Sequence, residues 1–317
     1  MSYELRRDET LGDNMRRICR KQIELALAIA TGEKETDDTP VHETRKHLKK
    51  ARAGLRLVRN EIGRGLFKRQ DRCLRDVGRL ISEIRDAEVR LQTVRQLQDL
   101  TQRQKRRKYR KLEEMMTLEL ENFLGAFAGW HVQAIPMLES VRDDIDAWPV
   151  DQLGYGQLCK SIQCTYKCGR DTLSEAKKQR TAECFHEFRT AAKQLWCQLR
   201  ILRPVNPVVL GNLGGELRSL GDLLGRAHDL SFLGDRLRQE RGQSKFERES
   251  HELLAVIEAS ASDLERGAAD LAERFFSERP RDFGRRLGAW VDDWTNAKSP
   301  SVAEDLVSGA RQSAAVV

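Results

Sequence analysis

Apolar residues recur every three or four positions along most of the chain, which is the period of an amphipathic α-helix. No stretch of strand length alternates between apolar and polar residues, so the pattern predicts an all-α protein. The expected helical segments are residues 11–30, 41–62, 67–100, 109–130, 158–176, 182–202, 210–237 and 246–276. Residues 143–156, rich in Asp, Pro and Gly, are typical of a turn and divide these helices into two groups.

The two groups carry similar sequences. The segment VHETRKHLKKARAGLRLVR from Val41 aligns without a gap with FHEFRTAAKQLWCQLRILR from Phe185, at an offset of 144 residues. Farther along the offset is 143 residues, and it pairs Arg75 with Arg218, Gly78 with Gly221, Leu80 with Leu223 and Asp86 with Asp229. The chain is therefore expected to be a duplicated helical unit of about 140 residues, each copy able to form a bundle.

Composition narrows the class of protein. In 317 residues, 56 Lys and Arg against 49 Asp and Glu give a net charge of +7. The apolar run at residues 25–30 is far shorter than the ~20 residues of a membrane span. No signal peptide is recognisable after Met1. Seven cysteines, an odd number without regular spacing, are expected to be reduced thiols of a cytoplasmic protein.

A row of basic side chains follows one face of the helix expected at residues 41–62. At ~100° per residue the row stays within an arc of roughly 100° and extends ~25 Å. Its members are His42, Arg45, Lys49, Arg52, Arg56 and Arg59. Thr39 followed by Pro40 predicts the start of this helix.

An apolar row runs beside the basic one and is expected to face the interior of the bundle; it consists of Thr44, Leu48, Ala51, Leu55 and Val58. The second copy repeats the basic row at His186, Arg189, Lys193, Arg200 and Arg203. Trp196 stands there at the counterpart of Arg52.

The basic rows have few partners close by in the sequence. Between residues 41 and 59, Glu43 is the only acid among seven Lys and Arg, so a lattice of ion pairs within the helix is not available. Such a row is either a solvated helix face, partly compensated by acids such as Asp86 and Asp229 of neighbouring helices, or a surface for an external polyanion. Because the row occurs twice, we favour the polyanion.

The residue types favour phosphates over nucleobases. Arginine forks and lysine ammonium groups suit a backbone of repeating phosphates. Base recognition commonly uses aromatic platforms, and the rows contain a single aromatic residue, Trp196. Non-specific RNA binding stays open as an alternative.

Five segments in this order resemble the CHAD family, named for its conserved-histidine α-helical domain. They are VHETRKHLKKARAGLRL from Val41, IRDAEV around Arg85, YKCGRDTL from Tyr166, FHEFRTAAKQLW from Phe185 and HDLSFL from His228. The resemblance covers about residues 11–294. It implies two tandem four-helix bundles related by pseudo-twofold symmetry, with a basic central surface that binds inorganic polyphosphate.

The resemblance also implies a domain organisation and a site. One CHAD domain is expected at residues 1–294, with bundles at about 9–142 and 152–294, and a disordered tail at residues 295–317. The anion-binding role is carried to both basic rows, with Tyr166, Lys167 and Arg170 as flanking candidates. The first row is expected to contribute more, because Trp196 interrupts the second.

The leading hypothesis is a non-catalytic polyphosphate-binding or targeting module without a cofactor or a metal. Expected partners are polyphosphate, granules that store it, and CYTH-type triphosphate enzymes, which often accompany the family. One alternative is an enzyme of phosphate metabolism, or a metal-binding protein, that uses His42 and His186, since histidine suits both roles. Another is a granule-associated scaffold recruited by polyphosphate or RNA. No GxxxxGK[ST] phosphate loop is present.

Overall fold

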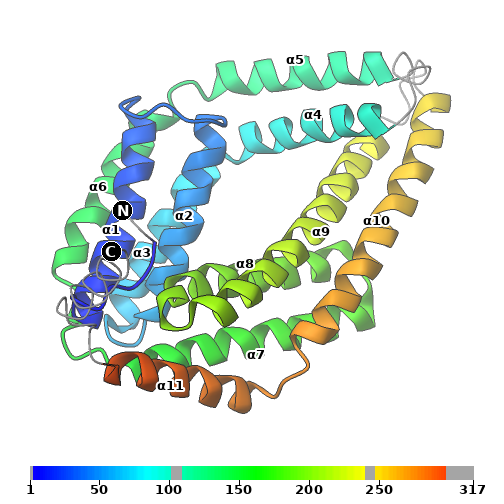
Figure 1. Ribbon diagram of the computed structural model, residues 1–317. Coiled ribbons are helices and arrows are strands. Elements are labelled where there is room, and N and C mark those ends of the chain that lie inside the picture. Colours follow the sequence, from blue (N-terminus) through cyan, green and yellow to red (C-terminus); the bar gives the residue numbers. More distant parts are fainter. Residues whose placement is uncertain (1–2, 101–108, 240–246, 298–317) are drawn as a thin grey trace, which may run out of the picture.

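The computed structural model describes residues 3–100, 109–239 and 247–297. Within these ranges the chain forms helices and no strand, which confirms the all-α prediction. The first half contains α1 (Leu11–Ala30), α2 (Pro40–Leu57), α3 (Gly63–Leu80), α4 (Ser82–Leu100), α5 (Arg110–Ala126) and α6 (Trp130–Asp146). The second half contains α7 (Tyr155–Gln179), α8 (Ala182–Ile201), the short 3-10 helix η2 (Arg203–Val205), α9 (Pro207–Gln239), α10 (Glu247–Phe275) and α11 (Pro280–Asn296) (Figure 1).

Threonine side chains start the two helices that carry the basic rows. The Thr39 hydroxyl accepts a hydrogen bond from the backbone N–H of His42 at 3.2 Å, and Pro40 occupies the first turn of α2, as predicted. Thr181 caps α8 in the same way, accepting from the N–H of Cys184 at 3.3 Å. Each cap satisfies a backbone donor that the helix itself leaves free.

The helices pack into two bundles that share one core. In the first, α2 lies against α1 and α3, and α6 lies against α1 and α3. In the second, α8 lies between α7 and α9, and α11 packs on α7 and η2. The bundles meet where α2 packs on α8, and a continuous apolar cluster includes buried residues of both.

A second apolar cluster lies away from the bundles. It joins α4 and α5 of the first half to the C-terminal part of α9 and to α10, through residues such as Leu91, Met116, Leu233 and Ile257. In Figure 1, α4 and α5 extend along the top and meet the upper ends of α9 and α10 at the right. Among the described helices, the halves therefore touch where α2 packs on α7 and α8, and again where α4 packs on α9.

The structure corrects the long helix predicted at residues 67–100. The helix is interrupted at Ile81, between α3 and α4. The Ser82 hydroxyl donates a hydrogen bond to the carbonyl of Arg79 at 2.8 Å. Ile81 and Ile84 are fully buried against Val41 and the aromatic residues of the connection between α5 and α6. The aligned position in the second half, Leu224, lies inside the uninterrupted α9. Burial of Ile81 and Ile84 against distant residues thus decides the break, which the local apolar period does not reveal.

Two further differences concern helix ends. The helix predicted at residues 109–130 ends at Ala126, and α6 then continues to Asp146, inside the stretch predicted as a turn. The predictions contained no helix at residues 280–296, where α11 forms. The predicted tail begins at Thr295 in the last turn of α11, and from residue 298 onward it lies outside the described residues.

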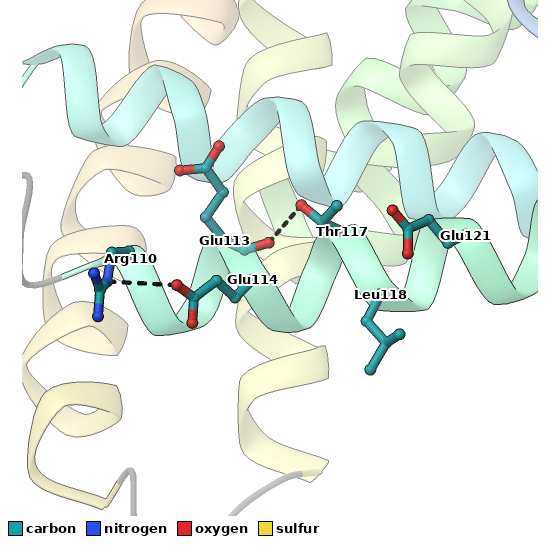
Figure 2. Close-up of a pocket in the computed structure, with 6 residues that line it drawn as sticks. All are labelled: Arg110, Glu113, Glu114, Thr117, Leu118 and Glu121. Atoms are coloured by element: carbon teal, nitrogen blue, oxygen red, sulfur yellow. Dashed lines mark hydrogen bonds and ion pairs between the residues drawn. The ribbon is translucent and has the colours of Figure 1, made fainter.

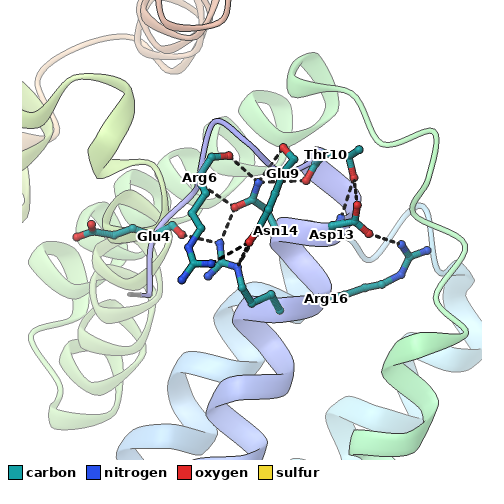
Figure 3. Close-up of polar contacts among 8 residues, drawn as sticks. Glu4, Arg6, Glu9, Thr10, Asp13, Asn14 and Arg16 are labelled. Atoms are coloured by element: carbon teal, nitrogen blue, oxygen red, sulfur yellow. Dashed lines mark hydrogen bonds and ion pairs between the residues drawn. The ribbon is translucent and has the colours of Figure 1, made fainter. Parts of the chain in front are cut away.

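The segment before α1 fastens the two halves together. The Tyr3 hydroxyl donates to the carbonyl of Lys50 in α2 at 2.9 Å, and the Leu5 N–H donates to the carbonyl of Ile201 in α8 at 3.0 Å. Asn14, fully buried in α1, holds the segment in place (Figure 3). Its amide group donates to the carbonyls of Arg6, Glu9 and Thr10, and its oxygen accepts from the Arg6 N–H at 2.7 Å.

We expect Asn14→Ala to lower the free energy of unfolding by about 2–4 kcal/mol, because buried backbone groups lose their partners. Urea denaturation followed by circular dichroism measures this change. Gln92→Ala, at an exposed position of α4, is the control and should change stability by less than about 0.5 kcal/mol. Equal effects of the two substitutions would contradict the role given to Asn14.

Candidate anion-binding site

The apolar row of α2 faces the core and sets the direction of the basic row. Thr44, Leu48, Ala51, Leu55 and Val58 are all buried, as predicted. The neighbouring basic side chains therefore emerge at the edge of the bundle, beside α3. The guanidinium of Arg45 donates to the carbonyl of Gly78 in α3 at 3.0 Å, which fixes it across the surface between the two helices.

A pocket of about 240 Å³ opens between α2 and α3. Five cationic side chains and no carboxylate line it: Arg45, Lys49, Arg52, Arg75 and Arg79, together with Leu48, Leu74, Gly78 and Ser82. Arg79 also pairs with Asp76 at 2.6 Å, and Arg75 pairs with the buried Asp71 at 3.3 Å. Such a lining attracts anions and repels cations.

In the second half, the basic row of α8 lies against α9. The absence of a side chain at Gly225 lets the Arg189 guanidinium approach the helix, since a Cβ atom there would lie 3.4 Å from its Nη2. Lys193 lies alongside Gly221 in the same manner. The Nε of Arg189 is buried without a hydrogen-bond partner. The second half thus presents an arginine and a lysine at the positions that align with Arg45 and Lys49.

The packing of α2 on α8 brings the two basic rows together. Arg56 donates to the side-chain oxygen of Gln194, and Gln198 donates to the carbonyl of Ala53 at 3.4 Å. At the offset of 144 residues, Arg56 corresponds to Arg200 and Gln194 corresponds to Lys50. Lys50 and Arg200 also lie within electrostatic reach of each other.

Lys49 and Lys193 are aligned with each other at the offset of 144 residues, and they meet at the centre of the contact between the halves. Lys49 is open to solvent yet surrounded by neighbouring protein. That surrounding, followed by the positive charges of Lys193, Arg189 and Arg45, lowers its pKa to about 7. Burial, followed by Arg189, lowers the pKa of Lys193 to about 8. An anion bound between them would favour the charged form of both.

The two acids expected as partners are present but only partly compensate the cations. Asp86 of α4 lies near Arg45, and Asp229 of α9 lies near Arg189 and Lys193. Burial raises the pKa of each carboxyl group, while these cations oppose the rise. Each half therefore places one buried carboxylate behind its arginine, and the cations nearer the centre outnumber the acids.

The remaining basic residues of α2 are tied to neighbouring helices or turns. Arg52 pairs with the buried Asp71 of α3 at 2.8 Å. Arg59 is exposed, and its guanidinium lies 5.7 Å from the ring centre of Phe67. The structure therefore brings Lys49 and Arg56 against the second half and places Arg59 just beyond the C-terminal end of α2.

Two predicted residues of the second row lie away from the centre. Arg200 stacks on Trp196, 4.9 Å from its ring centre, and on Tyr3 at 5.7 Å. Arg203 is exposed and pairs with Glu4 at 3.6 Å. Both contact the segment before α1, on the side of α8 where Lys50 lies.

The flanking candidates on α7 separate into core and surface. Tyr166 is fully buried, stacks on Phe283 with ring centres 4.1 Å apart, and donates its hydroxyl to backbone carbonyls of Phe275 and Glu278. It is a core residue, so its predicted place on the binding surface is corrected. Arg170 also donates to the Glu278 carbonyl, and Lys167 is an exposed partner of Asp171.

Several residues of the site were absent from the sequence-based prediction. Arg75 and Arg79 enter from α3, Arg85 from α4 and His228 from α9. The signal for the α3 residues was available, because Arg72, Arg75 and Arg79 follow a three- and four-residue spacing. Arg85 and His228 lie within the two aligned segments IRDAEV and HDLSFL.

The predicted histidines lie at the start of the rows. His42 Nε2 lies 3.6 Å from Asp38, and burial followed by Arg85 lowers the pKa of His42. Asp38, His42 and Glu43 form the one group within the described ranges whose potential metal-ligating atoms lie within 4.8 Å of one another. The Lys46 ammonium binds Glu43 at 2.8 Å, so a cation already occupies that carboxylate.

Another hollow, on α5, has the opposite character. Figure 2 shows it lined by Arg110, Glu113, Glu114, Thr117, Leu118 and Glu121. Arg110 pairs with Glu114 at 3.4 Å, and the side chain of Leu118 is 58% exposed. Three glutamates against one arginine exclude this hollow from an anion-binding surface.

None of the described helices is both long enough and apolar enough to cross a bilayer. All seven cysteines are described, and each is a free thiol. Comparison with curated proteins found no match.

Comparison with solved structures found the fold. A CHAD domain from the plant Ricinus communis superposes with a TM-score of 0.62 at 17% sequence identity, covering 87% of this chain and 95% of that one. PptA from Streptomyces chartreusis superposes with a TM-score of 0.60 at 14% identity, covering 84% of this chain and 99% of that one. The sequence model of the CHAD domain matches residues 17–238, which include both basic rows. The chain therefore belongs to the CHAD domain family.

Proposed function

We propose that this protein binds inorganic polyphosphate, without chemistry of its own, along the basic surface that α2 and α3 of the first half form with α8 and α9 of the second, around the contact of α2 with α8. The observation that carries the proposal is the convergence of Arg45, Lys49, Arg189 and Lys193 from both halves, with two partly buried carboxylates as their acidic neighbours. Such a cluster is electrostatically costly without an anion. A polyanion removes the repulsion and releases its own counterions.

The shape and lining of the surface favour a flexible chain of phosphates over nucleobases. The pocket between α2 and α3 has arginines and a lysine in its wall and no aromatic residue. The guanidinium of Arg200 already stacks on Trp196, the aromatic residue of the second row, and so competes with a base for that ring. Arginine forks and lysine ammonium groups match the oxygens of successive phosphates.

The proposed role is binding or targeting. Polyphosphate held on this surface would carry the protein to polyphosphate-rich granules in the cytoplasm. A CYTH-type triphosphate enzyme would then act as a separate partner on the same polymer. Binding of RNA with equal affinity, or release of orthophosphate, are the outcomes that would favour the scaffold or the enzyme instead.

We expect the double variant Lys49→Gln/Lys193→Gln to bind polyphosphate about tenfold to hundredfold more weakly, because two ammonium–phosphate contacts are lost at the centre of the site. Isothermal titration calorimetry with polyphosphate of defined length measures the affinity. The matched control is Lys160→Gln/Lys178→Gln, which removes the same net charge from exposed positions on α7. Equal losses in both double variants would mean that net charge, and not this surface, holds the polymer.

Affinity should fall steeply with salt and rise with polymer length. If about six phosphates are neutralised, a slope of ~0.7 per contact predicts a loss of roughly 300-fold between 50 and 200 mM salt. The double lysine variant should lower the slope by about 1.4. A triphosphate should bind weakly because it cannot fill a row ~25 Å long.

The same titrations test the alternatives. Single-stranded RNA serves as a competitor, and orthophosphate is measured in the same samples. Poor displacement by RNA and no released phosphate would support a non-catalytic polyphosphate binder. A salt slope near zero, or affinity independent of length, would contradict the proposed mode of binding.

A further inference from the structure

One difference between the two halves of the basic surface places a histidine in one half where the other has an arginine. Arg85 of α4 and His228 of α9 correspond at the offset of 143 residues, and they follow the aligned pair His42 and His186 on the facing helices. Arg85 lies within electrostatic reach of His42, whereas the His228 ring lies 4.7 Å from the ring of His186. An arginine stays charged at every relevant pH, while a histidine changes its charge near neutrality.

Helices α8 and α2 bring positive charge to His228. From α8 come His186, Arg189 and Lys193, and from α2 comes Lys49. On α9 itself, Phe232 stacks on the opposite side with ring centres 6.1 Å apart, and Asp229 is the adjacent carboxylate.

Two more helices complete the surroundings. From α4, Arg85 acts on Asp229 and on Arg189. Helix α10 packs on α9 farther along, through apolar residues such as Leu254 and Ile257 against Leu233 and Leu237.

These surroundings favour neutral imidazoles when no anion is bound. Burial, followed by the charges of Arg189, His186 and Lys193, lowers the pKa of His228 to about 4. Burial followed by Arg189 and Lys49 also lowers the pKa of His186. Two imidazoles in ring contact repel each other when both carry a positive charge. The negative charge of a phosphate beside them would favour the uptake of one proton by the pair.

We propose that the second half of the site binds polyphosphate together with a proton, which the His186–His228 pair takes up from solvent, whereas the first half, with Arg85, binds without this proton. The inference rests on the proposed function. It makes affinity increase as pH falls near pH 6, where the arginines of the basic rows do not change their charge. The class of ligand stays a chain of phosphates, and the pair supplies a pH-dependent part of its recognition.

The direction of the effect follows from linkage. A group whose pKa is higher in the complex than in the free protein stabilises the complex when the pH falls below its pKa in the complex. The gain in binding free energy stops growing once the pH falls below the pKa of the group in the free protein, and that pKa is about 4 for His228. Lys49 and Lys193 take up protons on the alkaline side of neutrality, so the histidine pair is observed separately at about pH 6.

The test is calorimetric titration with long polyphosphate at about pH 6 and about pH 8, each in two buffers that differ in ionisation enthalpy. The dependence of the binding enthalpy on the buffer gives the number of protons taken up. For the wild type we expect proton uptake at both pH values: Lys49 and Lys193 account for it at about pH 8, and the histidine pair accounts for most of it at about pH 6. Near pH 6 the affinity should rise about three- to tenfold for each pH unit of acidification, the upper value being one full proton. Chains of many phosphates keep the contribution of the titrating end groups small.

The variants separate the pair from its background. His228→Asn removes the titrating ring, and His228→Arg places in the second half the residue that Arg85 supplies in the first. Both variants should lose most of the proton uptake at about pH 6, and their affinity for polyphosphate should depend less on pH near that value. His131→Asn, on α6 away from the site, is the matched control and should behave as the wild type. If a His228 variant loses its helical circular dichroism, His186→Asn provides the same comparison.

The outcomes are distinct. Wild-type binding with equal proton uptake in both His228 variants would overturn the inference and leave polyphosphate binding intact. Absence of wild-type binding at both pH values would overturn the proposed function itself. Loss of uptake in the His228 variants, with uptake retained in His131→Asn, would establish the pair as the pH-dependent part of the site.

Discussion

The packing of α2 on α8 is the constraint on which the site depends, because it forces like charges together. The apolar row of α2 is buried in the bundle, so the basic row beside it lies at the junction between the two halves. There Lys49 meets Lys193 and the two arginines behind them. Apolar burial in the shared core supplies the free energy that holds these cations close, at about 25 cal/mol for each Å² of apolar surface buried.

The rest of the fold braces this contact from two sides. The segment before α1 bonds to α2 through Tyr3 and to α8 through Leu5, so it crosses the junction on one side. On the other side, α4 and α9 meet in the distal apolar cluster, where Arg90 lies over Phe232 and pairs with Glu119 at 2.7 Å. With contacts at both ends, the halves have little freedom to separate and relieve the repulsion at the centre. A site held in this way is preorganised for an anion and does not have to be assembled when the anion arrives.

The halves are similar in plan but not in chemistry. Arg45 and Arg189 occupy corresponding places, each with an aspartate behind it. The first half adds a pocket with arginines from α3, whereas the second lays its arginine on Gly225 and substitutes a histidine for Arg85. The break at Ile81 contributes to this difference, since it separates α3 from α4 while α9 continues straight through the aligned position. The two halves thus place different titratable groups, an arginine and a histidine, at corresponding points of the basic surface.

The sequence by itself determined what depends on neighbours a few residues away. The helical period, the Thr39 cap and the burial of Thr44, Leu48 and Ala51 all follow from hydrogen bonds and side-chain spacing within one or two turns. The membership of the basic rows followed from the same spacing, and so did the aligned second copy.

Only the tertiary structure decided which basic residues meet. It placed Lys49 beside Lys193, tied Arg52 to Asp71, moved Tyr166 into the core and brought His228 onto His186. The physical reason is that the charge state and the accessibility of a side chain depend on every helix packed around it. For Lys49 and Lys193 those helices are joined across 144 residues of chain, and no local period carries that information.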